Sequence, residues 1–215
     1  MSGRPADLTA WPVVALERTS DVRRGPWAWD LTLGRAAAGG ALPRRLSPPA
    51  GPAGEATLRA VLAACASLGP RVILPWAVRS PADMDRLLEG LVRHSRRPPA
   101  ELVVPIVASG FLGPDAQAPA HAGYARAALG DPSLYRSAVA RLDLGEGDMV
   151  LLAPLPPGAK GRWLRDLAAL APPQVATVAR GVTSRALAAE LRDAGVSHAS
   201  GRALGEPSRA PVGVA

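Results

Sequence analysis

The chain has 215 residues, a formal net charge of +7 at pH 7 and a hydrophobic fraction of 48%. That length suits one domain, and the apolar content supplies a real core, which argues against wholesale disorder. The sequence has no apolar run of about 18 residues and no secretory signal pattern at its start. We therefore expect no membrane span and a cytoplasmic protein of bacterial type.

The positive charge comes almost entirely from arginine, since Lys160 is the only lysine. The basic residues are scattered along the chain, and aromatic residues make up only 4% of it. Nucleic-acid binding usually needs clustered basic residues, and single-strand binding also needs aromatic stacking surfaces. Specific nucleic-acid binding is therefore not expected, and Lys160 is interpreted as a solvated loop residue.

Apolar segments alternate with helical patterns along the chain. Their nearly continuous hydrophobicity is typical of strands that are buried on both faces. The segments are 11–16, 27–33, 71–78, 101–109, 148–155, 174–179 and 196–200. Such βα repeats predict an α/β fold, either a (β/α) barrel or a doubly wound sheet. We expect a single domain over 1–207, with a flexible loop at 36–54 and a disordered tail at 208–215.

Several helices have recognisable ends. Ser80 followed by Pro81 predicts an N-cap and a first helical residue. Near the C-terminus, Thr183 or Ser184 caps a helix that Gly195 ends in a left-handed conformation. The stripes expected to be buried are Leu58, Val61, Leu62, Cys65 and Leu68; Met84, Leu87, Leu88 and Leu91; Trp163, Leu164, Leu167 and Leu170; and Leu187 and Leu191. Cys65 is thus interpreted as a small core residue, without a catalytic role.

Landmarks in serial order carry a resemblance to a known family. They are AWPVVAL, LTLGR, RVILPWAVRSPADMDRLL, ELVVPIVAS, AALGDPSLYRSAVARL, DMVLLA and the closing stretch ARGVTSRALAAELRDAGVSHASGRALGEP. Together they resemble the EAL domains, the cyclic di-GMP phosphodiesterases, over most of the chain. The resemblance implies a TIM-like (β/α) barrel of EAL type, shortened and eroded around residues 110–126, where HAGYARAA makes a poor strand.

The same resemblance implies that the chemistry has been lost. Family members use two Mg²⁺ or Mn²⁺ ions, which require oxygen ligands. The EAL glutamate falls on Leu31, and the neighbouring Asp30 is expected to point to the other face of the strand. The remaining metal-binding and catalytic positions fall on Pro75, Pro105, Ala108, Ala127, Ala128, Leu151, Ala153, Arg180 and Ser200. The resemblance therefore implies a protein that is not an enzyme and that has no metal site and no cofactor.

Two functions remain from this interpretation. The first is a catalytically inactive EAL-like domain that acts as a regulatory or structural protein-binding module, with Trp76 as a candidate anchor for the partner. The alternative is a receptor that binds cyclic di-GMP or a related anionic nucleotide without hydrolysing it. Arg35, which matches the family's phosphate-contacting arginine, and Arg180 are the candidate anion-binding residues. A subunit of a larger assembly cannot be separated from the first function on sequence alone.

Overall fold

The computed structural model describes nine strands and three α-helices. The described residues are 12–18, 26–31, 45, 47–66, 68–69, 71–111, 123–129, 142–152, 174–201, 203–204 and 208–209. The helix expected around Trp163 lies outside these ranges, and so do Arg35, Ala153 and Lys160.

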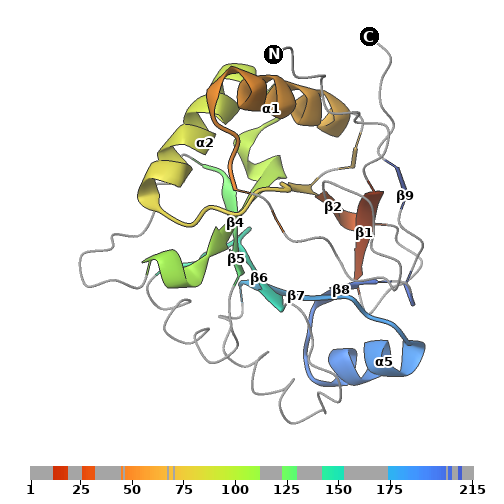
Figure 1. The fold of residues 1–215 in the computed structure, drawn as a ribbon. Coiled ribbons are helices and arrows are strands. Elements are labelled where there is room, and N and C mark those ends of the chain that lie inside the picture. The colour runs from red at the N-terminus through yellow and green to blue at the C-terminus, as the bar shows by residue number, and fades with distance from the viewer. Residues whose placement is uncertain are drawn as a thin grey trace.

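Seven parallel strands, β2 to β8, neighbour one another in chain order and curl around a common interior (Figure 1). The first strand, β1, pairs antiparallel with both β2 and β8, so it joins the two ends of this parallel sheet. The strands are β1 Pro12–Arg18, β2 Pro26–Leu31, β3 Val72–Ile73, β4 Leu102–Val107, β5 Ala125–Leu129, β6 Met149–Leu152, β7 Ala176–Arg180, β8 His198–Ser200 and β9 Ser208–Arg209. The expected TIM-like α/β barrel is confirmed.

Two segments differ from the sequence-based expectations. The segment HAGYARAA, expected to be a poor strand, contributes most of β5, which pairs in parallel with both β4 and β6. Small alanine side chains give little strand propensity, but two neighbouring strands supply the hydrogen bonds that hold this segment extended. The expected disordered tail is also wrong for Ser208 and Arg209, because β9 pairs antiparallel with β1.

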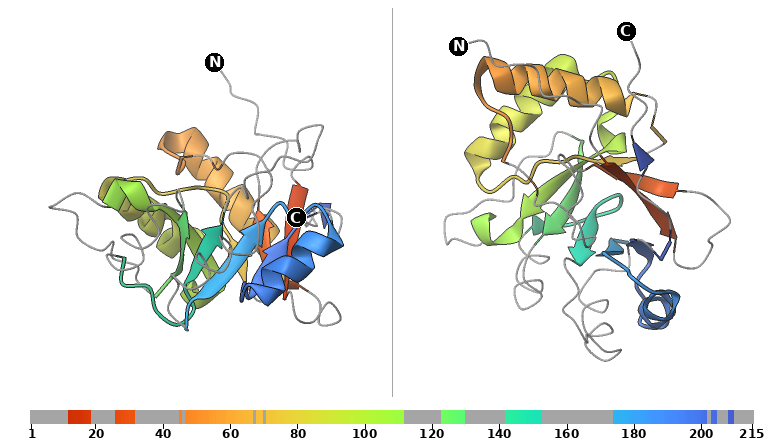
Figure 2. Two further views of the ribbon diagram at one scale, coloured as in Figure 1. Left: turned by 90° about the horizontal axis from the view of Figure 1, so that it is seen from below. Right: turned by 45° about the vertical axis from the view of Figure 1, so that its right-hand side comes forward.

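Three helices lie outside the ring of strands: α1 Gly51–Cys65, α2 Pro81–His94 and α5 Arg185–Asp193. Figure 2 shows α1 beside α2, with α5 separate from them near β8. Helices α2 and α5 begin as their caps predict, since Ser80 accepts a hydrogen bond from the Asp83 amide and Ser184 accepts one from the Leu187 amide. Short 3₁₀ turns, η2 Pro99–Glu101 and η3 Ala108–Phe111, flank β4.

The flexible loop was expected to span 36–54, but α1 already begins at Gly51, so the last four residues of that range are helical. Gly51 has φ +68°, a left-handed conformation that a glycine adopts readily, and Pro52 then sits in the first helical turn. None of the described helices has both the length and the apolar character needed to cross a membrane.

Buried side chains form two clusters on opposite faces of the strands. The outer cluster joins the strands to α1, α2 and α5 and contains the predicted stripes of α1 and α2, with Cys65 fully buried. Leu68, expected in the first of these stripes, follows the end of α1 and is partly buried against the cluster. Of the stripe expected on α5, Leu191 is buried and Leu187 is partly buried against this cluster. The inner cluster takes its residues from strands alone: Ala28, Ile73, Val103, Ala125, Ala127, Met149, Leu151 and Val178. Because side chains alternate along a strand, membership of the inner cluster identifies which residues face the barrel interior.

Candidate functional site

The polar residues of interest lie where the parallel strands end inside the barrel. Arg180 is the last residue of β7, Ser200 is the last residue of β8, and Asp30 is next to last in β2. Arg180 lies two residues beyond the inner-cluster residue Val178, and Asp30 lies two residues beyond Ala28. Ala199 packs in the outer cluster, so its neighbour Ser200 lies on the opposite face of β8. All three side chains therefore face inward at the end of the barrel where barrel enzymes carry their chemistry.

Asp30 is held by two arginines in an arrangement that we call the Asp30 cluster, consisting of Asp30, Arg45 and Arg180. Its Oδ1 lies 2.5 Å from Nη2 of Arg45, and its Oδ2 lies 2.6 Å from Nε of Arg180. The Asp30 side chain is 0% exposed, and the two arginine side chains are 4% and 6% exposed. Each carboxylate oxygen thus faces a different guanidinium group in a region from which water is largely excluded.

This geometry corrects the expected orientation of the first site residue. Leu31, on which the family's EAL glutamate was placed, packs in the outer cluster with the helices. Asp30 is the residue that faces the interior, although it was expected to point away from the site. The physical reason is the alternation of strand side chains, through which an offset of one residue exchanges the two faces. The interior face of β2 therefore carries a carboxylate near the C-terminal end of the strand.

Arg45 reaches the cluster from the segment that precedes α1. Its Nη1 donates to the backbone carbonyl of Leu74, and its Nη2 donates to Asp30. Burial lowers the pKa of Arg45 below its ordinary value to about 10; the charge of Asp30 opposes this shift and the charge of Arg180 reinforces it. Sequence reasoning missed this residue, because an arginine between prolines in a polar segment carries no signal of burial.

The Asp30 cluster does not fit the divalent cations that EAL phosphodiesterases use. Both oxygens of Asp30 already face guanidinium groups, and the two arginines leave the cluster with one excess positive charge. A divalent cation needs several oxygen ligands and is repelled by nearby positive charge. Among the described residues, no group of three His, Cys, Asp or Glu side chains is placed to hold a metal.

One atom of the cluster and one group beside it are buried and face no partner, by hydrogen bond or ion pair, within the described part of the chain. They are Nη2 of Arg180 and the hydroxyl of Ser200, which is 0% exposed. Arg180 and Ser200 are direct partners in the parallel register of β7 and β8. Buried polar groups almost always have partners, so two orphaned groups on adjacent strand ends mark an unusual place in the fold.

Several other positions of the implied site are apolar and buried. Ala127 and Leu151 belong to the inner cluster, and Ala128 packs in the outer one. Pro75 and Pro105 are buried as well, while Ala108 begins η3. Arg35, the second candidate for anion binding, lies outside the described residues, and so does Ala153.

The candidate role of Trp76 as a partner-binding anchor needs correction. Its side chain is 1% exposed and packs in the outer cluster, where it is among the largest fully buried side chains. A residue placed there contributes to packing of the fold and presents no surface to a partner. Of the other tryptophans, Trp27 and Trp29 are half-buried, and Trp27 stacks on His198 with ring centroids 3.7 Å apart.

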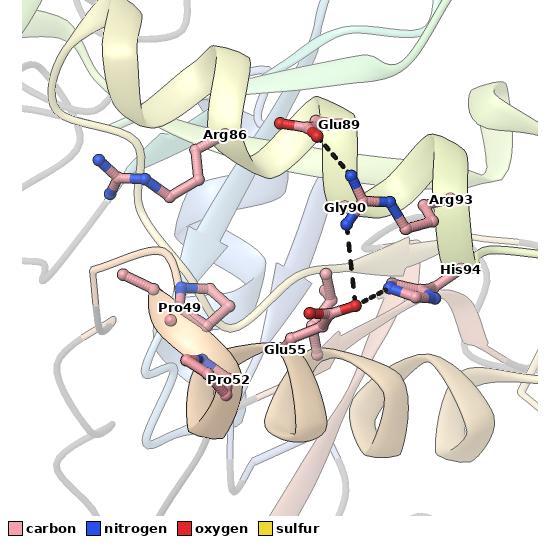
Figure 3. Close-up of a pocket in the computed structure, with 11 residues that line it drawn as sticks. Pro49, Pro52, Glu55, Arg86, Glu89, Gly90, Arg93 and His94 are labelled. Atoms are coloured by element: carbon pink, nitrogen blue, oxygen red, sulfur yellow. Dashed lines mark hydrogen bonds and ion pairs between the residues drawn. The ribbon is translucent and has the colours of Figure 1, made fainter.

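A second feature, on the outer face of the barrel, is a groove between α1 and α2 with a volume of about 280 Å³. Figure 3 shows Glu55 of α1 facing His94 and Arg93 of α2. Nε2 of His94 lies 2.8 Å from a Glu55 carboxylate oxygen, and Arg93 also pairs with Glu89 one turn earlier. The groove lining is Pro49, Ala50, Gly51, Pro52, Glu55, Leu58, Arg86, Glu89, Gly90, Arg93 and His94. It therefore combines a proline-rich rim with paired charges of both signs.

No family model and no curated protein matches this sequence. Solved structures do match in fold. The PaMucR phosphodiesterase in complex with cyclic di-GMP aligns with a TM-score of 0.58 at 18% identity, over 94% of this chain and 97% of that one. An EAL domain protein from Listeria monocytogenes aligns with a TM-score of 0.59 at 12% identity, over 94% of this chain and 90% of that one.

The fold is that of an EAL domain. The EAL enzyme Bd1971 in its cGMP-bound form aligns with a TM-score of 0.65 at 10% identity, over 92% of this chain. The chain spans only 62% of the length of Bd1971. At these identities the likeness establishes the architecture, while the chemistry of the site depends on the residues that this chain places at its strand ends.

Proposed function

We propose that this chain is a non-catalytic EAL-like domain that acts as a regulatory or structural module by binding a protein partner. The observation that carries this proposal is the Asp30 cluster, in which the carboxylate near the C-terminal end of β2 faces Arg45 and Arg180. The carboxylate is thereby committed to two internal ion pairs at the end of the barrel that would carry catalysis.

Metal-assisted cleavage of a phosphodiester needs ligands that hold the ions and polarise a water molecule. On the interior faces of β5 and β6, the described residues Ala127 and Leu151 offer hydrocarbon instead. Arg180 ends β7 with a positive charge, which would repel a metal ion. These substitutions support a barrel that keeps its fold and has exchanged hydrolysis for binding.

The outer groove between α1 and α2 supports a protein partner. Pro49 and Pro52 form a rigid apolar rim, and Arg86 at the other side of the groove is half-exposed. On the same helix, Val92 is 70% exposed, the only large hydrophobic side chain exposed in the described part of the chain. An apolar rim with flanking arginines is a common composition for a surface that binds another protein.

A second function, a non-hydrolysing receptor for cyclic di-GMP or a related anionic nucleotide, is favoured by the charge of the Asp30 cluster. Two guanidinium groups face one carboxylate, so the cluster has one excess positive charge, which suits a phosphate group. PaMucR, which shares this fold, is a phosphodiesterase whose structure holds cyclic di-GMP.

Turnover of cyclic di-GMP tests the non-catalytic part of the proposal. The purified protein at micromolar concentration is incubated with the dinucleotide and either Mg²⁺ or Mn²⁺, and the products are separated by chromatography. We expect no linear dinucleotide above a protein-free control. Metal-dependent product that disappears in Asp30→Asn would contradict the proposal, because it would show that Asp30 binds a catalytic ion.

Capture of partners tests the binding part. Immobilised wild-type protein is compared with Arg86→Glu, which reverses a charge on the groove rim, and with Glu190→Lys, a matched reversal on the exposed face of α5. We expect a stoichiometric protein partner that is retained by the wild type and by Glu190→Lys and is lost in Arg86→Glu. Equal retention by all three proteins would rule out the groove as the binding surface.

A further inference from the structure

Among the described residues, the Asp30 cluster holds two positive charges and one negative charge. Arg45 and Arg180 together bring two positive charges into a region where the side chains are at most 6% exposed, and Asp30 returns one negative charge. Of the described residues, no other acid forms an ion pair with either arginine. Burial of an unmatched charge is costly, so the cluster is stabilised by any anion that can reach it.

The two orphaned groups, one in the cluster and one beside it, are both hydrogen-bond donors that can serve an anion. Nη2 of Arg180 can only donate, and the hydroxyl of Ser200 can rotate to donate. Because Arg180 and Ser200 are register partners on parallel strands, their side chains project from the same face of the sheet at the same height. A single acceptor group between them could satisfy both donors.

We infer that the C-terminal ends of β7 and β8 form a binding site for one oxyanion of the phosphate class on the interior face of the barrel. The anion is held by the Arg180 guanidinium and the Ser200 hydroxyl. Phosphate oxygens match the planar donors of arginine and accept a further bond from a hydroxyl. Asp30 pairs with Nε of the same guanidinium, so its negative charge opposes the binding of a second anion at Arg180. The site takes an anion without any metal. This inference deepens the second function proposed above and rests on it.

The test uses inorganic phosphate as the probe. Thermal unfolding of the full chain is followed by circular dichroism as phosphate is added, with sodium chloride replacing it at constant ionic strength in the reference series. For the wild type we expect a melting temperature that rises with phosphate and saturates, because a ligand that binds only the folded state stabilises it.

Three variants separate the site from a general effect of anions. Arg180→Lys keeps the charge and loses the planar fork, and Ser200→Ala loses the hydroxyl; each is expected to weaken phosphate binding by roughly 10- to 100-fold. Arg93→Gln, in the outer groove, is expected to bind phosphate like the wild type. A further variant, Asp30→Asn, removes the internal competitor, so its phosphate affinity is expected to rise even though its melting temperature without phosphate falls.

Equal phosphate stabilisation of the wild type, Arg180→Lys and Ser200→Ala would overturn the inference, as would no stabilisation of the wild type or of Asp30→Asn. A second titration, with cyclic di-GMP in place of phosphate, identifies the source of the group. Mutual competition would place a nucleotide phosphate in the site, and phosphate binding alone would identify a free oxyanion as the ligand. If phosphate does not bind and cyclic di-GMP is not hydrolysed, only this inference is overturned. Hydrolysis of cyclic di-GMP would instead overturn the proposed loss of catalysis.

Discussion

Arg180 at the end of β7 forms an ion pair with Asp30 of β2, with Nε and Oδ2 2.6 Å apart. The two strands are not neighbours in the sheet, so this pair links separate parts of the barrel wall across the interior. Arg45 adds the segment before α1 to the same carboxylate. The end of the barrel that carries the chemistry in barrel enzymes is here held by a structural connection, and its removal has measurable consequences.

Loss of the Asp30 carboxylate should destabilise the fold strongly. Asp30→Ala leaves Arg45 and Arg180 buried without a counter-charge, and removal of one partner from a buried ion pair typically costs about 3–5 kcal/mol. Urea unfolding measures the free energy of unfolding. Asp85→Ala on the exposed face of α2 is the control and should change stability by less than about 0.5 kcal/mol. Equal stability of the two variants would mean that the ion pairs contribute nothing to the fold.

Gly201 should not tolerate a side chain. It has φ +151°, and a Cβ atom there would lie 2.3 Å from the backbone nitrogen and oxygen of Val182, which cannot move aside as a flexible side chain could. Gly201→Ala is expected to destabilise the protein by about 1–3 kcal/mol in urea unfolding. Gly145→Ala is a matched control, since a Cβ atom at that position would have nothing within 4 Å, and it should be nearly neutral. A neutral Gly201→Ala would show that the loop after β7 is not packed against the end of β8.

The Cys65 thiol should be inert in the folded protein. Burial raises its pKa from 9.0 to about 12, so the reactive thiolate is scarce at pH 8. A colorimetric thiol reagent should detect no thiol in the native protein and one thiol per chain after unfolding in guanidinium. Rapid reaction of the native protein would contradict the burial of Cys65 in the outer cluster.

The same raised pKa predicts a loss of stability in alkali. Above about pH 9 the thiol ionises in the unfolded chain, while the folded chain keeps its proton. The unfolded state then binds fewer protons, so the contribution of Cys65 is complete below pH 9 and is lost as the pH rises toward 12. Unfolding measured at pH 8 and pH 10 should show a smaller decline in Cys65→Ala than in the wild type. An equal decline would assign the alkaline sensitivity to other groups.

Arg97 should stabilise the C-terminal end of α1 through its planar fork. Its Nη1 donates to the carbonyls of Cys65 and Leu68, and its Nη2 donates to the carbonyl of Gly69 at 2.7 Å. Arg97→Lys keeps the charge but cannot reproduce these contacts, so we expect a loss of about 1–3 kcal/mol in the free energy of unfolding. Arg96→Lys, on an exposed neighbour, is the control. Matching stabilities would show that charge alone accounts for the role of Arg97.

The sequence was sufficient where local chemistry determines structure. Ser80, Pro81 and the apolar stripe of α2 define that helix through capping and 3.6-residue periodicity, and the structure confirms both. The left-handed residue after α5 is likewise Gly195, with φ +88°. Such signals act within a few residues and therefore need no knowledge of the fold.

Features that depend on distant parts of the chain were not predicted. The inward orientation of Asp30 depends on strand register, in which an offset of one residue exchanges the two faces. The burial of Arg45 depends on Asp30 and Leu74, which are distant in sequence, and β5 depends on neighbouring strands that compensate for its small side chains. Trp76 was misplaced for a related reason, since its position beside an expected ligand says nothing about how much of it is covered.

Binding of Mn²⁺ is the measurement that tests the Asp30 cluster most directly. Free Mn²⁺ is followed by electron paramagnetic resonance as the metal-free protein is added at micromolar to millimolar concentration. Because both oxygens of Asp30 face guanidinium groups, we predict that the signal of free Mn²⁺ persists in the wild type and in Asp30→Asn alike. Stoichiometric loss of the signal in the wild type, with recovery in Asp30→Asn, would contradict the account, because it would show that Asp30 still serves as a metal ligand.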